Sequence, residues 1–184
     1  MIRTEMRQFP LDNGASSKEI NNPFHGKVSQ RVIIGILQTT SFNAQYDKDT
    51  FAFGQYGVEY TKQIVTGEEY PCETLELNTT NGWKDLIGYH QFFLDAAGCL
   101  YRNAGNMVRF KDWGRGKNRT LFMFSRVANG RHDDLGLLPK NKGMINIHLK
   151  SVAQASQKTI VIYAEYEGMM EIDSIQGATL MGVH

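Results

Sequence analysis

Cysteine is scarce in this 184-residue sequence, and long apolar runs are missing from it. The two cysteines, Cys72 and Cys99, are too few for a disulfide framework, and their spacing fits neither a zinc site nor a redox pair. We therefore expect reduced thiols and a cytosolic or nuclear setting, without secretion. A membrane-spanning helix needs about 18 or more consecutive apolar residues, and no such run occurs. Residues 1–10 also lack the continuous apolar stretch of a signal peptide.

An excess of one charge is missing as well, because 20 Lys and Arg residues stand against 19 Asp and Glu residues. This balance does not by itself indicate nucleic acid or a membrane as the main partner. One stretch departs from it: residues 101–131 hold eight Lys or Arg residues and one acid, Asp112. We interpret this stretch as a solvated loop or a protein contact; nucleic-acid binding is possible but not favoured.

Six residues of the basic stretch are candidates for contact with a neighbouring subunit or an acidic partner. They are Arg109, Lys111, Trp113, Arg115, Lys117 and Arg119. For Trp113, and for the nearby Phe110, the alternative is ordinary packing of a loop against its own domain.

Histidine and the other site-forming residue types make no recognisable catalytic pattern. A metal site of the cupin type needs two histidines one residue apart on a strand, and none of the five histidines forms such a pair. The nucleophile motif Gly-x-Ser-x-Gly is absent, and residues 114–117 lack the full spacing of a phosphate-binding loop. We therefore expect no catalytic residue, no metal, no cofactor and no enzymatic activity.

Short β-type runs, separated by turns rich in Gly, Asn and Asp, dominate the sequence. They predict strands over residues 31–38, 58–65, 120–127, 144–149 and 159–166, and residues 169–172 are expected to continue the last strand past a bend at Gly168. One helix is predicted over residues 83–97.

The arrangement of apolar residues refines this prediction. Residues 31–38 are apolar on both faces, which fits a strand buried in a sheet. Residues 58–65 alternate, with Val58, Tyr60 and Ile64 on one face and Glu59, Thr61 and Gln63 on the other. Together the elements predict an all-β fold: a jelly-roll β-sandwich with one helix in a long connection, forming a single domain over residues 1–184.

Several short motifs, taken in order, carry a resemblance to a known family. They are residues 22–26 (NPFHG), 29–37 (SQRVIIGIL), 41–46 (SFNAQY), 49–56 (DTFAFGQY), 143–149 (GMINIHL), 159–166 (TIVIYAEY) and 171–173 (EID). Their order and spacing resemble the major capsid proteins of Maverick/Polinton-type elements and related viruses, including transposon-derived copies in animal genomes. Those proteins carry two jelly-rolls, and this chain resembles the second. It can be a fragment, a single-jelly-roll relative or a domesticated copy.

The resemblance implies a structural protein. It predicts self-association, with a trimer favoured, or packing with a sister jelly-roll or another capsid protein. The expected location is the virion, after production in the host cytoplasm or nucleus. The alternative is a non-catalytic binding module on the same fold, which would present an exposed patch of aromatic and polar residues to a ligand or receptor.

Overall fold

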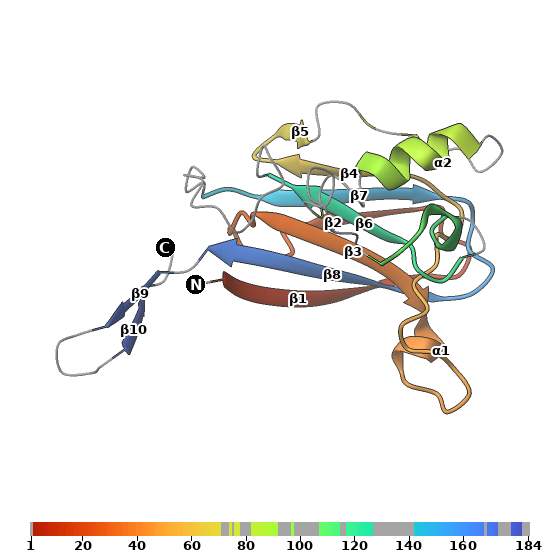
Figure 1. The fold of residues 1–184 in the computed structure, drawn as a ribbon, viewed down its shortest axis with the longest axis horizontal. Helices are drawn as coiled ribbons and strands as arrows, with labels where there is room; N and C mark the ends of the chain where they lie inside the picture. The colour runs from red at the N-terminus through yellow and green to blue at the C-terminus, as the bar shows by residue number, and fades with distance from the viewer. Residues whose placement is uncertain are drawn as a thin grey trace.

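The fold is a β-sandwich of two four-stranded antiparallel sheets (Figure 1). The computed structural model describes residues 2–70, 74, 76–77, 82–91, 97, 107–114, 117–126, 142–167, 169–172 and 178–181. One sheet, here named the β1 sheet, has the order β1 (Ile2–Leu11), β8 (Lys158–Glu167), β3 (Arg31–Gln38) and β6 (Leu121–Ser125). The other, the β2 sheet, has the order β2 (Ser17–Asn21), β7 (Ile145–Ser151), β4 (Val58–Val65) and β5 (Glu68–Tyr70).

The strand order defines a jelly-roll. The first strand pairs with the eighth, the second with the seventh, the third with the sixth and the fourth with the fifth, all antiparallel. Four nested pairs of this kind, divided between two facing sheets, are the jelly-roll topology. The predicted fold class is therefore confirmed. The five strands predicted within the sandwich are all present, and β3 and β4 have the predicted bounds.

The core lies between the two sheets and is filled from both sides. Alternate residues of β3 point inward from the β1 sheet, and alternate residues of β7 point inward from the β2 sheet, each at most 2% exposed. These residues are Val32, Ile34 and Ile36 on β3, and Ile145, Ile147 and Leu149 on β7. Antiparallel strands with one buried face alternate in this way.

The face assignment predicted for β4 is wrong because the strand contains a β-bulge. Val58 pairs with Ser151 and Tyr60 with Lys150, so one extra residue, Glu59, is inserted in β4. Beyond the bulge the two faces exchange. Thr61 and Gln63, at 1% and 0% exposure, therefore share the inward face with Val58, while Tyr60 and Ile64 point outward.

The expected continuation of β8 is also wrong. Residues 169–172 form β9 (Met169–Ile172), which pairs with β10 (Ala178–Met181) in a separate two-stranded sheet. The pairing of β8 with β1 ends at this point, because Ile2, the first residue of β1, lies opposite Glu167. Figure 1 shows the β9–β10 hairpin extending past the end of the sandwich.

The predicted helix lies in the long connection between β5 and β6. It is α2 (Gly82–Gly88), followed by a π-helical turn at residues 89–91; residues 92–96 lie outside the described residues. The same connection contains a 3-10 turn at Phe110–Asp112. A second short helix, α1 (Thr39–Phe42), follows β3 directly.

Candidate interaction surfaces

Four of the six predicted contact residues are exposed side chains on the β5–β6 connection. They are Arg109, Lys111, Lys117 and Arg119. Arg115 lies outside the described residues. Trp113, in contrast, is only 3% exposed. Four cations of the basic stretch are therefore exposed to solvent, whereas its tryptophan is buried.

Trp113 is part of the core of the domain. Its indole N–H donates a hydrogen bond of 3.1 Å to the carbonyl of Leu121, at the start of β6. Its ring makes edge contacts with Tyr89, at 5.8 Å between centroids, and with Phe122, at 6.0 Å. Edge-to-face contacts of buried aromatics stabilise such packing. Trp113 therefore anchors the β5–β6 connection to the sandwich, as the loop-packing alternative describes.

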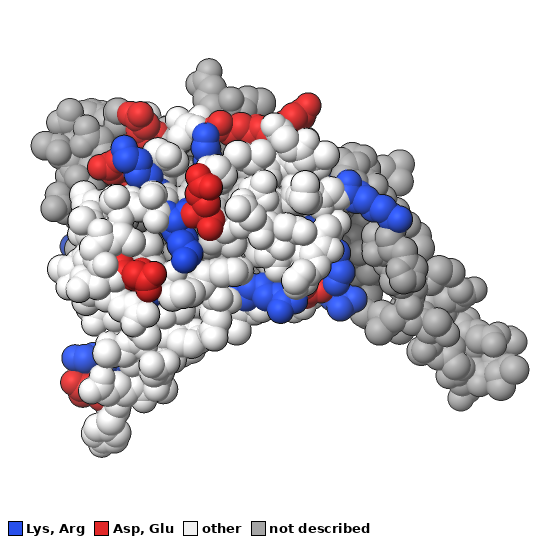
Figure 2. Space-filling model, turned by 180° about the vertical axis from the view of Figure 1, so that it is seen from behind, with Lys and Arg blue, Asp and Glu red and all other residues white. Residues whose placement is uncertain are grey.

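The basic stretch is partly neutralised from within. Arg109 Nε lies 3.0 Å from Asp112 Oδ2, and this hydrogen bond, together with nearby cations, lowers the pKa of Asp112 below its ordinary value. Phe110 is 38% exposed and lies at 5.6 Å from the ring of Tyr89. On the side of the molecule seen in Figure 2, cations also lie beside acids over the coloured part of the surface. The described surface seen there is mixed in charge.

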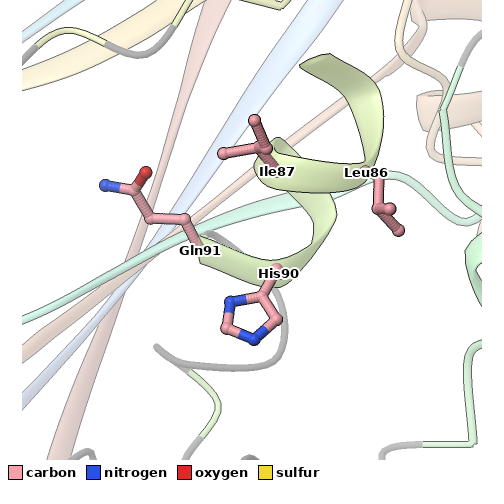
Figure 3. A pocket seen from close by; sticks show the side chains of 4 residues that line it. All are labelled: Leu86, Ile87, His90 and Gln91. Atoms are coloured by element: carbon pink, nitrogen blue, oxygen red, sulfur yellow. The ribbon is translucent and has the colours of Figure 1, made fainter. Parts of the chain in front are cut away.

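A shallow hollow of about 450 Å³ lies against α2 and the turn that follows it. Its lining residues are Leu86, Ile87, His90 and Gln91, and the first two are 40% and 51% exposed. Figure 3 shows the four side chains leaving the helix in different directions. They come from one short segment and do not close around a ligand, so the hollow lacks the enclosure typical of small-molecule sites.

The segment between α1 and β4 presents two aromatic side chains to water. We name residues 39–53 the β3–β4 arm, which projects from one end of the sandwich (Figure 1). Tyr46 on this arm is fully exposed, and Phe51 is 76% exposed. The arm is nevertheless ordered, because the N–H of Phe51 donates to Asp49 Oδ1 at 2.8 Å and the N–H of Lys48 donates to the carbonyl of Gln45 at 2.9 Å. Exposed aromatics on an ordered projection are typical of contact sites.

The outer faces of the two sheets differ in chemistry. On the β2 sheet, charged side chains pair across neighbouring strands, as in Lys62 with Glu69 at 3.2 Å and Lys150 with Glu59 at 2.8 Å. On the β1 sheet, one row of apolar residues crosses the outer side of all four strands: Met6, Tyr163, Ile33 and Met123. This apolar row was not predicted from the sequence. The available signal was β3, whose residues are apolar on both sides.

Among the residues that the structure describes, no group of three or more His, Cys, Asp and Glu side chains lies close enough to hold a metal ion. None of the described helices has the length and apolar character needed to cross a membrane.

Comparison with known proteins finds a similar fold in a viral capsid protein. The crystal structure of the mavirus major capsid protein superposes with a TM-score of 0.50 over 98% of this chain, at 9% sequence identity. An uncharacterized protein of Caenorhabditis elegans is 22% identical over 174 residues, or 94% of this chain. The chain spans 40% of the mavirus protein and 41% of the nematode protein. No model of a known protein family matches it. Because identity to the solved structure is low, that likeness establishes the fold alone.

Proposed function

We propose that this chain is a structural protein, a viral-type capsid jelly-roll that associates with copies of itself or with a sister jelly-roll. The observation that carries the proposal is the nested order of its eight strands, together with the likeness to a capsid protein over 98% of the chain. A protein that builds a shell works through its surfaces and needs no catalytic residue. We therefore propose that it is not an enzyme.

The finer assignment is to the Maverick/Polinton-type capsid proteins, with this chain corresponding to their second jelly-roll. Three of the motifs that carry this resemblance coincide with strands β3, β7 and β8. These strands contribute core residues, so the motifs fit the jelly-roll fold, which supports the assignment. Core packing alone accounts for part of the similarity. Under this proposal the protein resides in the virion, after production in the host cytoplasm or nucleus.

The proposed partners are other jelly-rolls, with a trimer favoured for the assembly. The two similar proteins are each about two and a half times as long as the chain, which leaves room for a second unit of comparable size. Binding of nucleic acid is not favoured, because Asp112 pairs with Arg109 within the exposed basic stretch.

A binding module on the same fold is the second candidate function, and the β3–β4 arm favours it. Tyr46 and Phe51 form the kind of exposed aromatic surface that a receptor or ligand would contact. This candidate requires no self-association. It predicts that the purified chain is a monomer or a small oligomer.

The mass of the purified chain in solution separates the two candidates. We would measure it by light scattering after size exclusion, at several protein and salt concentrations. A concentration-dependent oligomer, with a trimer or a larger assembly favoured, is expected for a capsid jelly-roll. A strict monomer at the highest concentration would contradict self-association and leave the binding module as the better account. A loss of mass at high salt would indicate that the exposed cations take part in the contact.

A further inference from the structure

The β3–β4 arm ends in a tip whose side chains all lie in water. Residues 43–49 are consecutive exposed residues, and they include Tyr46. Phe51 follows this run and is 76% exposed. Burial of such aromatic rings against another surface is favourable. Because backbone hydrogen bonds already hold the arm, it loses little conformational entropy when it binds.

A second exposed apolar surface lies on the β5–β6 connection. Four of its side chains are between 38% and 92% exposed. They are Leu86, Ile87, Met107 and Phe110, and we name them the connection patch. Tyr89 joins the two segments that carry them, since its ring lies 5.6 Å from that of Phe110 and its hydroxyl donates a hydrogen bond to the carbonyl of Val108.

A single molecule leaves both surfaces exposed. Figure 1 shows the arm and α2 at the same end of the sandwich, with the arm extending away from α2. Asp47 of the arm pairs with its neighbour Lys48 at 3.2 Å, and Asp112 of the connection pairs with Arg109 at 3.0 Å. Within the part of the chain that the structure describes, no ion pair joins the arm to the connection. Another molecule is therefore needed to cover either surface.

The charges beside the two surfaces are opposite in sign. Residues 46–51 of the arm include two aspartates and one lysine. On the connection, the positive charges of Arg109, Lys111 and Arg119 lie near Asp112, so three cations stand against one carboxylate. Contact between the arm of one copy and the connection of another brings opposite charges together. Contact of arm with arm, or of connection with connection, would bring like charges together.

We propose that the β3–β4 arm of one copy docks on the connection patch of the next copy. Tyr46 and Phe51 pack on the apolar side chains of the patch, and the aspartates of the arm lie toward the cations. This inference rests on the proposed function and specifies the surfaces that it uses. Each copy donates an arm and receives one, and contacts of this kind close into a ring when the rotation between copies allows it. A ring of three is the trimer that the proposed function favours.

The connection patch has room for a side chain from another molecule. Leu86 and Ile87 line the shallow hollow of about 450 Å³, whose four lining side chains leave it open to solvent (Figure 3). An enclosed pocket suits a small molecule, whereas an open hollow between exposed apolar side chains suits a ring carried by a projecting arm.

The area of the contact favours a ring over an isolated pair. Two aromatic side chains bury about 300–500 Å², so one contact buries about 600–1,000 Å² when the partner surface is included. Specific interfaces bury about 1,200–2,000 Å², which makes a single contact weak. Three such contacts in a closed ring bury about 1,800–3,000 Å². We therefore expect monomers and trimers in solution, with few dimers.

The test removes one exposed apolar side chain at a time. Tyr46→Ser changes the arm, and Met107→Ser, at a methionine that is 92% exposed, changes the connection patch. Met144→Ser is the matched control, because Met144 is 57% exposed and its carbonyl accepts a hydrogen bond from the N–H of Thr66, beyond the other end of β4 from the arm. Ile87→Ser is a second variant of the patch. Thermal unfolding checks that each variant folds, and sedimentation equilibrium measures its association.

We expect Tyr46→Ser, Met107→Ser and Ile87→Ser each to raise the concentration needed for half-association by about tenfold or more, and Met144→Ser to leave it unchanged. Association of wild type should also weaken as salt rises from about 0.1 M to 1 M, because salt screens the opposite charges.

Separate outcomes distinguish this inference from the proposed function. If wild type associates and Tyr46→Ser associates equally well, or if the control weakens association as much as the other variants, the inference is overturned and the proposed self-association stands. If Tyr46→Ser weakens association while both patch variants leave it unchanged, the arm docks on a different surface, which also overturns the inference. If wild type remains a monomer at the highest concentration, the proposed self-association fails as well.

Discussion

Arg31 of β3 and Glu165 of β8 form a two-point ion pair across neighbouring strands. Arg31 Nε donates to Glu165 Oε2 at 2.8 Å, and Arg31 Nη2 donates to Oε1 at 2.7 Å. The two side chains are only 21% and 10% exposed. The planar guanidinium matches the carboxylate at both oxygens, a geometry that lysine cannot reproduce. The two residues lie directly opposite each other in the register of the two strands.

Removal of Arg31 should therefore destabilise the sandwich. Arg31→Met leaves a nearly buried carboxylate without its partner, and we expect the free energy of unfolding to fall by about 2–3 kcal/mol at neutral pH. The double variant Arg31→Met with Glu165→Leu should be more stable than Arg31→Met alone, because it removes the unpaired charge. Chemical denaturation measures all three proteins. If the double variant is the least stable, the cost arises from lost packing instead of an unpaired carboxylate.

Gly35 should not tolerate a larger side chain, because the ring of Phe53 lies directly over it. A Cβ atom at position 35 would stand 2.6 Å from Phe53 Cδ1 and 3.1 Å from Leu121 Cδ2. We expect Gly35→Ala to lower the free energy of unfolding by about 1–3 kcal/mol. In a Phe53→Ala background the same substitution should cost much less. An equal cost in both backgrounds, measured as a double-mutant cycle, would refute this steric explanation.

Gln63 and Gln55 are matched buried amides with opposite expectations. Both are at most 1% exposed, but only Gln55 is satisfied: its Nε2 donates to the carbonyl of Val58 at 2.9 Å and its Oε1 accepts from the N–H of Gly57 at 3.2 Å. Among the residues that the structure describes, none forms a hydrogen bond with either amide atom of Gln63. We expect Gln63→Leu to raise the free energy of unfolding by about 1 kcal/mol and Gln55→Leu to lower it by about 1–2 kcal/mol. A loss of stability in Gln63→Leu would indicate an internal water bonded to the amide.

The central strands could be predicted from the sequence, but the edges could not. β3 is a continuous run of β-branched and other apolar residues, and its bounds agree with the prediction. β1 was not predicted as a strand, because Arg3, Glu5 and Arg7 occupy its inward positions and Pro10 interrupts the alternation of apolar and polar residues. Charges can occupy those positions only because β1 is an edge strand, and a single sequence does not reveal which strand is at the edge. The bulge at Glu59 has no signal in the local sequence either. Beyond it, the predicted inward and outward faces of β4 are therefore the reverse of the observed ones.

Exposure to solvent could be predicted only for the charged candidate residues. Arg109 and Lys117 are exposed, as cations on a polar loop usually are. Trp113 stands among the same cations, yet its ring packs against Tyr89 of the helical segment and Phe122 of β6, a tertiary arrangement that the loop sequence does not show. The row of apolar residues across the outer side of the β1 sheet is likewise a product of register across four strands. Register between non-adjacent strands follows from tertiary packing and cannot be derived from any one segment.

Glu5 lies in a cluster of cations at the edge of the β1 sheet. Its Oε1 accepts a hydrogen bond from Lys27 Nζ at 2.7 Å, and Arg3 and Arg7 are its other charged neighbours. Burial raises the pKa of Glu5, but the bond from Lys27 and the three positive charges outweigh this effect and leave the pKa below its ordinary value of 4.5. A carboxyl group whose pKa is lowered by folding makes stability depend on pH.

We therefore expect Glu5→Gln to destabilise the protein in a pH-dependent manner. Because the pKa is lower in the folded state, the ionised carboxylate contributes its stabilisation above pH 4.5, and this contribution disappears as the pH falls through the folded pKa. At neutral pH the loss should be about 0.5–1 kcal/mol, since Lys27 is 40% exposed and water screens the pair. Thermal unfolding of both proteins between neutral and acidic pH measures the difference. In a Lys27→Met background it should be smaller at neutral pH, whereas a difference that stays constant across the pH range would show that the charge of Glu5 has no part in stability.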